Sequence, residues 1–176
     1  MPRQLRDREN EIAKRLTEEL DLSERSPFDE GNTMTTTTHV TALDHSIECT
    51  NVWLHELGQE LGSDDPQYAY RVLRAFLHNL RDRISLQETA QLAAQLPDLI
   101  RGIYYEGWNP SHTPAVYHDA KTFFDRVSAE AVMHGDTEAS FATMAAARVL
   151  RRHVSAGEIE DVLAVLPREI RAALTD

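Results

Sequence analysis

Apolar residues recur at three- and four-residue spacing along most of the chain from residue 39 onward, which predicts a series of amphipathic helices. The first such stripe consists of Leu43, Ile47, Thr50, Leu54, Leu57 and Leu61. We expect this helix to end at Gly62, because glycine readily adopts the left-handed conformation that terminates many helices. Alternating β-branched runs, which would indicate strands, never exceed a few residues. The hydrophobic pattern therefore predicts an all-α fold.

Capping residues mark the boundaries of the helices that follow. Asp65 precedes Pro66, as expected of an N-cap followed by a proline at the first helical position. Ser85 and Glu88 have the spacing of a capping box, in which the serine oxygen accepts from a backbone N–H. The helix that begins after Ser85 is predicted to end at Pro97, where the next helix starts.

The sequence also contains an internal repeat with an offset of 70 residues. Residues 81–101 read RDRISLQETAQLAAQLPDLIR, and residues 151–171 read RRHVSAGEIEDVLAVLPREIR. Between residues 75–104 and 145–174, ten of thirty aligned positions are identical, where ordinary composition would give roughly two. The identical pairs are Ala75/Ala145, Leu80/Leu150, Arg81/Arg151, Ser85/Ser155, Glu88/Glu158, Ala94/Ala164, Leu96/Leu166, Pro97/Pro167, Ile100/Ile170 and Arg101/Arg171. Both copies therefore encode the same succession of caps, apolar positions and helix-starting prolines.

This repeat predicts a duplicated helical bundle of two related modules, each of about four helices, packed as one domain around a pseudo-two-fold axis. We place this single helical domain at residues 39–176, with repeats at 44–107 and 114–176. Residues 1–38 are predicted to be an N-terminal helix or extension and a linker, partly flexible, because they combine a weak helical pattern with turn formers and a threonine run. Met34 is an alternative start residue.

Composition excludes several classes of protein. The chain has 176 residues and a formal net charge of −11, and its pI near 5.1 argues against a nucleic acid partner, because phosphate binding needs a clustered basic surface. No apolar run approaches the roughly 20 residues of a membrane helix, and no signal peptide is recognisable. A single cysteine, Cys49, excludes an internal disulfide. We therefore expect a cytoplasmic protein that binds neither nucleic acid nor a membrane.

Catalytic and metal-binding patterns are weak. The nearest groupings of metal-ligand type are His112, His118 and Asp119, and His39, Asp44 and His45. Neither has the i, i+4 histidine pair of a helical zinc site, and His55-Glu56 lacks a second histidine at residue 59. His78 offers an imidazole to a haem as an axial ligand, although a structural histidine is the better interpretation. We predict no catalytic residue, no metal site and no cofactor, and we favour a protein that is not an enzyme.

The best candidate for a binding surface is the aromatic segment around residue 105. Its candidate binding residues are Arg101, Tyr104, Tyr105, Glu106 and Trp108, and the equivalent segment of the second copy has no aromatic residue. Tyrosine and tryptophan combine large apolar area with a polar group, a composition common in binding patches. Two alternatives stay open: these aromatics fill the seam between the two copies, or they line a ligand-binding or enzymatic pocket there together with His112.

Several stretches of this sequence together resemble one bacterial protein family. They are Trp53-Leu-x-Glu-Leu57, Ala69-Tyr-Arg-x-Leu-Arg-Ala75, Leu77-His-x-Leu-Arg-Asp-Arg83, Ala94-Gln-Leu-Pro97, Arg101-Gly-Ile-Tyr-Tyr-Glu-Gly-Trp108 and, in the second copy, Gly157-Glu-Ile-Glu-Asp-Val-x-Ala-x-Leu-Pro167. Over roughly residues 44–174 the chain resembles the family called domain of unknown function 2267. The resemblance implies a small all-helical bacterial domain. It carries over no catalytic residue or cofactor, because no activity is established for the family.

Taken together, these patterns predict a non-enzymatic protein-interaction or scaffolding module. Its expected partner is another protein or a second copy of the chain, and a homodimer in a stress setting is the specific form that we expect. The alternative from a different class is the small-ligand or enzymatic pocket at the repeat seam.

Overall fold

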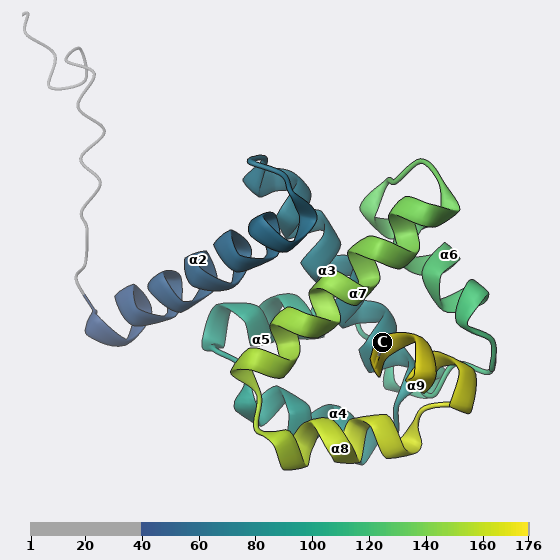
Figure 1. The fold of residues 1–176 in the computed structure, drawn as a ribbon. Coiled ribbons are helices and arrows are strands. Elements are labelled where there is room, and N and C mark those ends of the chain that lie inside the picture. Colours follow the sequence, from purple (N-terminus) through teal and green to yellow (C-terminus); the bar gives the residue numbers. More distant parts are fainter. Residues whose placement is uncertain (1–39, 176) are drawn as a thin grey trace, which may run out of the picture. The chain divides into compact units, whose positions relative to one another are not determined.

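The computed structural model describes residues 40–175, which form helices and connecting loops (Figure 1). The predicted extension at residues 1–38, with Met34, lies outside the described residues, as does the side chain of Asp136. The elements are α2 (Thr41–Leu61), α3 (Pro66–Arg83), α4 (Leu86–Gln95), α5 (Asp98–Tyr105), the 3₁₀ helix η1 (Pro110–His112), α6 (Ala120–Ala131), α7 (Asp136–His153), α8 (Ala156–Val165) and α9 (Arg168–Thr175). Residues 40–175 contain no strand, so the predicted all-α fold is confirmed.

The predicted helix boundaries are those of the structure. Gly62 ends α2 in the left-handed conformation, with φ 63°. The Asp65 side chain accepts a hydrogen bond from the backbone N–H of Gln67 and caps α3. The Ser85 hydroxyl accepts one from the backbone N–H of Glu88 and caps α4. Each of these contacts satisfies a backbone N–H that has no partner inside its own helix.

The bounds of three helices recur 70 residues later in the chain. α7 begins and ends 70 residues after α3, and α8 and α9 stand in the same relation to α4 and α5. α6 ends 70 residues after α2, but it begins only at Ala120 and so matches the second half of α2. The first half of α2 corresponds by this offset to residues 111–119, which include the end of η1 and a non-helical stretch.

Helices α3 and α7 lie at the centre of the packing. They contact each other, and α2 and α6 each contact both of them. α5 packs on α2 and α3, α9 packs on α6 and α7, and α4 lies beside α8 (Figure 1). The largest fully buried side chains are Trp53, Tyr104, Phe76, Phe123, Leu57, Leu73, Leu77, Leu80, Ile84, Leu92, Ile100 and Ile170. A single apolar core therefore joins helices α2–α5 to helices α6–α9.

The side of α2 that faces the core differs from the predicted stripe. The structure buries Ser46, Trp53 and Leu57, whereas Leu43 and Ile47 are 54% and 49% exposed. Only the beginning of α2 extends past the other helices (Figure 1). By Ser46, which is buried and accepts a hydrogen bond from the backbone N–H of Leu99, the side of α2 that faces the body is already covered. The apolar stripe at the beginning of α2 is consequently left on the surface.

Candidate functional site

The aromatic side chains of the predicted binding segment are buried or half-buried in the protein. Tyr104 is 0% exposed and belongs to the core, so it offers no surface to a partner. Its ring lies 5.3 Å from that of Tyr105, which lies 5.3 Å from the indole of Trp108. Tyr105 and Trp108 are half-buried, and the Trp108 Nε1 donates to the Thr113 hydroxyl at 3.0 Å. The aromatics therefore anchor the start of the segment that leads from α5 towards α6.

The two charged residues of the predicted set form ion pairs within the chain. Arg101 donates to the Asp98 carboxylate at 2.7 Å and to the Leu96 carbonyl. Glu106 is exposed, and its carboxylate accepts from Arg74 Nε at 2.7 Å. That hydrogen bond and the charge of Arg74 lower the pKa of Glu106. The structure thus brings the aromatic residues together, and it engages Arg101 and Glu106 within the chain.

A polar network that the sequence did not suggest joins α3 to α6. The carboxylate of Glu130 on α6 lies 2.6 Å from His78 Nδ1 and accepts from Arg74 at 2.8 Å and from Asn79 at 3.2 Å. The second ring nitrogen of His78 lies 2.7 Å from the carbonyl oxygen of Ile103. His78 is buried and both of its ring nitrogens are engaged, so its geometry suits linking helices rather than coordinating a haem iron. These partners are about 50 residues apart, which no local motif reveals.

Other candidate ligands do not converge. Within residues 40–175, no three His, Cys, Asp or Glu side chains lie close enough together to hold a metal ion. The nearest approach involving the thiol is that of His45 Nε2, 3.5 Å from Cys49 Sγ on the same side of α2. His55, one of the sequence candidates, contacts the Gln59 amide at 3.1 Å instead.

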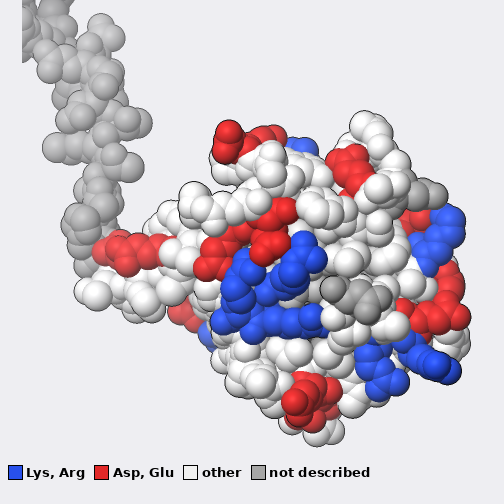
Figure 2. All heavy atoms as spheres, viewed as in Figure 1, with Lys and Arg blue, Asp and Glu red and all other residues white. Residues whose placement is uncertain are grey.

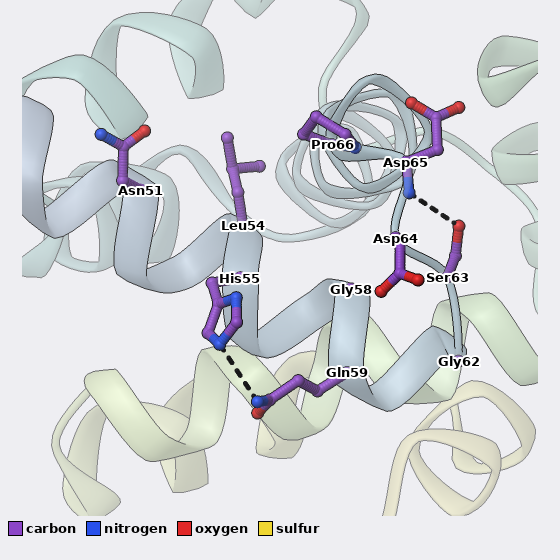
Figure 3. Close-up of a pocket in the computed structure, with 10 residues that line it drawn as sticks. All are labelled: Asn51, Leu54, His55, Gly58, Gln59, Gly62, Ser63, Asp64, Asp65 and Pro66. Atoms are coloured by element: carbon purple, nitrogen blue, oxygen red, sulfur yellow. Dashed lines mark hydrogen bonds between the residues drawn. The ribbon is translucent and has the colours of Figure 1, made fainter.

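Two of the open grooves beside α2 in the described structure are lined in part by apolar side chains. The first, of about 310 Å³, lies between the second half of α2 and the loop that leads to α3 (Figure 3). It is lined by Asn51, Leu54, His55, Gly58, Gln59, Gly62, Ser63, Asp64, Asp65 and Pro66. The second, of about 400 Å³, is lined by His45, Glu48, Cys49, Val52, Trp53, Gln95, Pro97 and His153. In it the Trp53 ring stacks on the imidazole of His153, with ring centres 4.7 Å apart.

The exposed apolar residues of α2 continue into the first groove. We call the following set the α2 face: Val40, Leu43, Ile47, Asn51, Leu54 and Gly58. At 100° per residue these positions fall within a sector of roughly 80° of the helix. Val40, Leu43 and Ile47 are exposed, and the last three line the groove. Exposed Leu99 lies beside this face, because its backbone N–H donates to the Ser46 hydroxyl at 3.0 Å.

The surroundings of the α2 face are acidic. Residues 39–70 contain six Asp and Glu residues and no Lys or Arg. Two of them, Glu56 and Glu60, lie on another side of α2 and pair with Arg148 and Arg152 of α7 at 2.8–2.9 Å. Figure 2 shows basic side chains gathered against acidic ones where α7 meets α2. Hydrogen bonds from Arg152 and Arg148 lower the pKa of Glu60. Both arginines are therefore ion-paired with acidic residues of α2.

The remaining acidic residues of this stretch are Asp44, Glu48, Asp64 and Asp65. Glu48, Asp64 and Asp65 are exposed. In the described residues, no ion pair involves Glu48 or Asp64. Figure 3 shows the Asp64 carboxylate directed towards the α2 side of the first groove and that of Asp65 directed away from it. The α2 face is therefore an exposed apolar stripe with exposed acidic residues nearby.

Sequence reasoning missed this surface because it assigned the Leu43–Leu61 stripe to the core. Spacing alone does not show which apolar positions of α2 face the core, since Ser46 is buried and the neighbouring Ile47 is exposed.

The chain belongs to a family of uncharacterized conserved proteins (DUF2267), whose family model matches residues 50–173. The family resemblance inferred from the sequence is thereby confirmed. No curated protein matches the chain in sequence. Among the described helices, none combines the length and the apolar character required to cross a membrane.

Proposed function

We propose that the chain is a protein-interaction module, built from a duplicated helical unit, and that it binds its partner through the α2 face. The observation that carries this proposal is the exposure of Leu43 and Ile47 on a side of α2 that the core does not cover. Contiguous apolar patches on the surface of a soluble protein often mark binding sites, and Val40, Leu43 and Ile47 form a continuous exposed run along α2.

The pairing of helices supports the duplication. Exchanging α2, α3 and α5 with α6, α7 and α9 leaves most packing relationships unchanged: α2 on α7 becomes α6 on α3, and α5 on α3 becomes α9 on α7. Equivalent side chains also make equivalent contacts. Arg81 donates to the carbonyl of Tyr104, and Arg151, 70 residues later, donates to the carbonyl of Leu174. These relationships favour two copies of one module around a pseudo-two-fold axis, with the first half of α2 added to the first copy.

A binding role is better supported than a pocket at the repeat seam. The grooves beside α2 are lined by none of Arg101, Tyr104, Tyr105, Glu106 and Trp108. Tyr104 is buried, and Arg101 and Glu106 are engaged in ion pairs. Because Tyr104 is buried, a partner could contact this segment only through Arg101, Tyr105, Glu106 and Trp108, as a secondary site.

Location and assembly belong to the same proposal. A single cysteine, which can form no internal disulfide, suits a reducing compartment such as the cytoplasm. A homodimer through the α2 face is one specific form of the proposal. Its competitor, a different protein as partner, is favoured by the acidic character of that face.

Site-specific photo-crosslinking in the host cell tests the proposal. A photoreactive amino acid at position 47 should yield one discrete crosslinked species, whereas the same residue at position 141 should yield none. Phe141 is a suitable control because it is an exposed apolar residue on α7. Equal crosslinking at positions 47 and 141, or no crosslinking at position 47, would show that the α2 face is not a binding surface.

A further inference from the structure

The chemistry around the α2 face specifies the partner more narrowly, on the assumption that the proposed function is correct. We infer that the α2 face binds an amphipathic helix of another protein whose apolar stripe is flanked by Lys or Arg side chains. The shape, the charge and the adjoining groove each contribute to this inference.

The shape of the face suits a helix. Val40 and Gly58 are the ends of the stripe, and the 18 helical steps between them, at a rise of 1.5 Å each, span roughly 27 Å. Its apolar positions follow three- and four-residue spacing, the pattern that a partner helix reads with its own i, i+3, i+4 and i+7 side chains. Leu99 of α5 widens the apolar strip at one side. A partner of about five helical turns would cover it.

The acidic residues near the α2 face favour Lys or Arg on either side of the partner helix's apolar stripe. Glu48 is exposed near the middle of the helix, and Asp64 and Asp65 are exposed at the groove end. Residues 39–70 supply no Lys or Arg to neutralise them, and the nearby Arg148 and Arg152 are paired with Glu56 and Glu60. Complementary charge accelerates association and excludes wrong partners, so basic flanks on the incoming helix are expected.

The first groove offers a place for one basic side chain. It adjoins Leu54 and Gly58 of the face, and the Asp64 carboxylate is directed towards its α2 side (Figure 3). Its volume of about 310 Å³ exceeds what a Lys or Arg side chain occupies. The methylene groups of such a side chain would lie against Leu54 and Pro66 while its charged end meets Asp64.

A second copy of this chain fits the same face poorly. Antiparallel pairing of two α2 helices would bring Glu48 and its acidic neighbours together without a basic residue from either helix. The net charge of −11 on each chain adds long-range repulsion. Like charges in apposition suppress association, so the occupant is a basic segment from elsewhere.

Two labelled helical peptides of about 18 residues provide the test. Both carry the same leucine stripe, and their remaining positions are Lys in one and Gln in the other. Fluorescence anisotropy with the full-length protein should give at least tenfold tighter binding of the Lys peptide. The double variant Leu43→Ser/Ile47→Ser should weaken binding at least tenfold, and Glu48→Gln/Asp64→Asn should remove most of the Lys advantage and reduce the salt dependence. Phe141→Ser, on α7, is the matched control and should bind as the wild type does.

The outcomes separate the inference from the proposed function. If the Gln peptide binds as tightly as the Lys peptide and Leu43→Ser/Ile47→Ser abolishes both, the α2 face is a binding surface without the inferred charge preference. If Leu43→Ser/Ile47→Ser binds the Lys peptide as well as the wild type does, both the inference and the assignment of the α2 face as a binding surface are wrong. If the wild type fails to bind the Lys peptide at about 100 µM, the inference alone is wrong. A wild-type mass near twice 20.0 kDa by light scattering, reverting to one chain in the same variant, would identify a second copy as the occupant and overturn the basic-helix inference.

Discussion

Gly62 and Val132 end α2 and α6 in the same left-handed backbone conformation, although they lie 70 residues apart. Their φ angles are 63° and 58°. The residue after each closes the same turn: Ser63 N–H donates to the carbonyl of Gly58, and Met133 N–H donates to that of Ser128. The same turn is therefore made once by glycine, which tolerates positive φ, and once by a β-branched residue for which that conformation is strained.

Replacing Val132 with glycine should stabilise the protein. The left-handed conformation costs an L-residue about 1–2 kcal/mol, and the greater freedom of glycine in the unfolded chain returns part of that gain. Val132 is 65% exposed, so little burial is lost. We expect the free energy of unfolding to rise by about 0.5–1 kcal/mol, with a Tm increase of about 2 °C. The measurement is urea and thermal unfolding followed by circular dichroism.

The reciprocal substitution Gly62→Val serves as the control for this interpretation. It should lower the free energy of unfolding by about 1–2 kcal/mol, because no heavy atom near Gly62 obstructs a side chain and the backbone conformation alone is penalised. Equal tolerance of valine at both positions would contradict the assignment of strain to Val132.

Glu158 should destabilise the protein at neutral pH. Burial, together with the negative charges of Glu88 and Asp161, raises the pKa of Glu158 above its ordinary value of 4.5. The folded state therefore favours the protonated carboxyl: its contribution to stability is complete below about pH 4.5 and is lost as the pH rises through the folded pKa. Glu158→Gln removes the charge and keeps the Ser155 cap, whose hydroxyl accepts from the backbone N–H at 158.

We expect Glu158→Gln to gain up to about 1 kcal/mol of stability at pH 7 and nothing at pH 3.5. Urea unfolding at the two pH values measures both differences. The matched control is Glu160→Gln, since Glu160 is exposed on the same helix. A gain that is the same at both pH values, or equal in the control, would rule out an effect of the Glu158 charge.

Removing the Glu130 carboxylate should weaken the packing of α6 on α3 and lower the stability of the protein. Its carboxylate accepts from Arg74 and Asn79 and meets His78, so Glu130→Ala leaves several buried or half-buried donors without a partner. The expected loss is about 2–4 kcal/mol in the free energy of unfolding. Glu106→Gln removes a carboxylate that also binds Arg74, but at the surface, and should have little effect. Similar losses for the two variants would contradict a special role for Glu130.

Local features of the fold follow from the sequence, whereas long-range ones do not. Asp65, Ser85 and Gly62 act within a few residues of themselves, so their positions predict where helices begin and end. The partnership of His78 with Glu130 spans 52 residues and depends on how α6 crosses α3. No local pattern carries that information.

The candidate site was difficult for the same reason. Leu43 and Leu57 belong to one apolar stripe, yet only Leu57 is buried, because the core covers the side of α2 that carries Ser46, Trp53 and Leu57. Spacing along α2 predicts that the helix is amphipathic. It does not predict how much of the apolar side will be covered.

Tyr104 and Trp108 should respond very differently to truncation, although the sequence placed them in one binding segment. Tyr104 is fully buried among core residues, so Tyr104→Ala opens a cavity and should cost about 3–5 kcal/mol in the free energy of unfolding. Trp108 is half-buried and makes one side-chain hydrogen bond, to Thr113, so Trp108→Ala should cost about 1–2 kcal/mol. Urea unfolding of the two variants measures the difference. If Trp108→Ala were as damaging as Tyr104→Ala, the indole would be a core element of equal weight. If Trp108→Ala also weakened binding of the Lys peptide, the partner surface would extend beyond the α2 face.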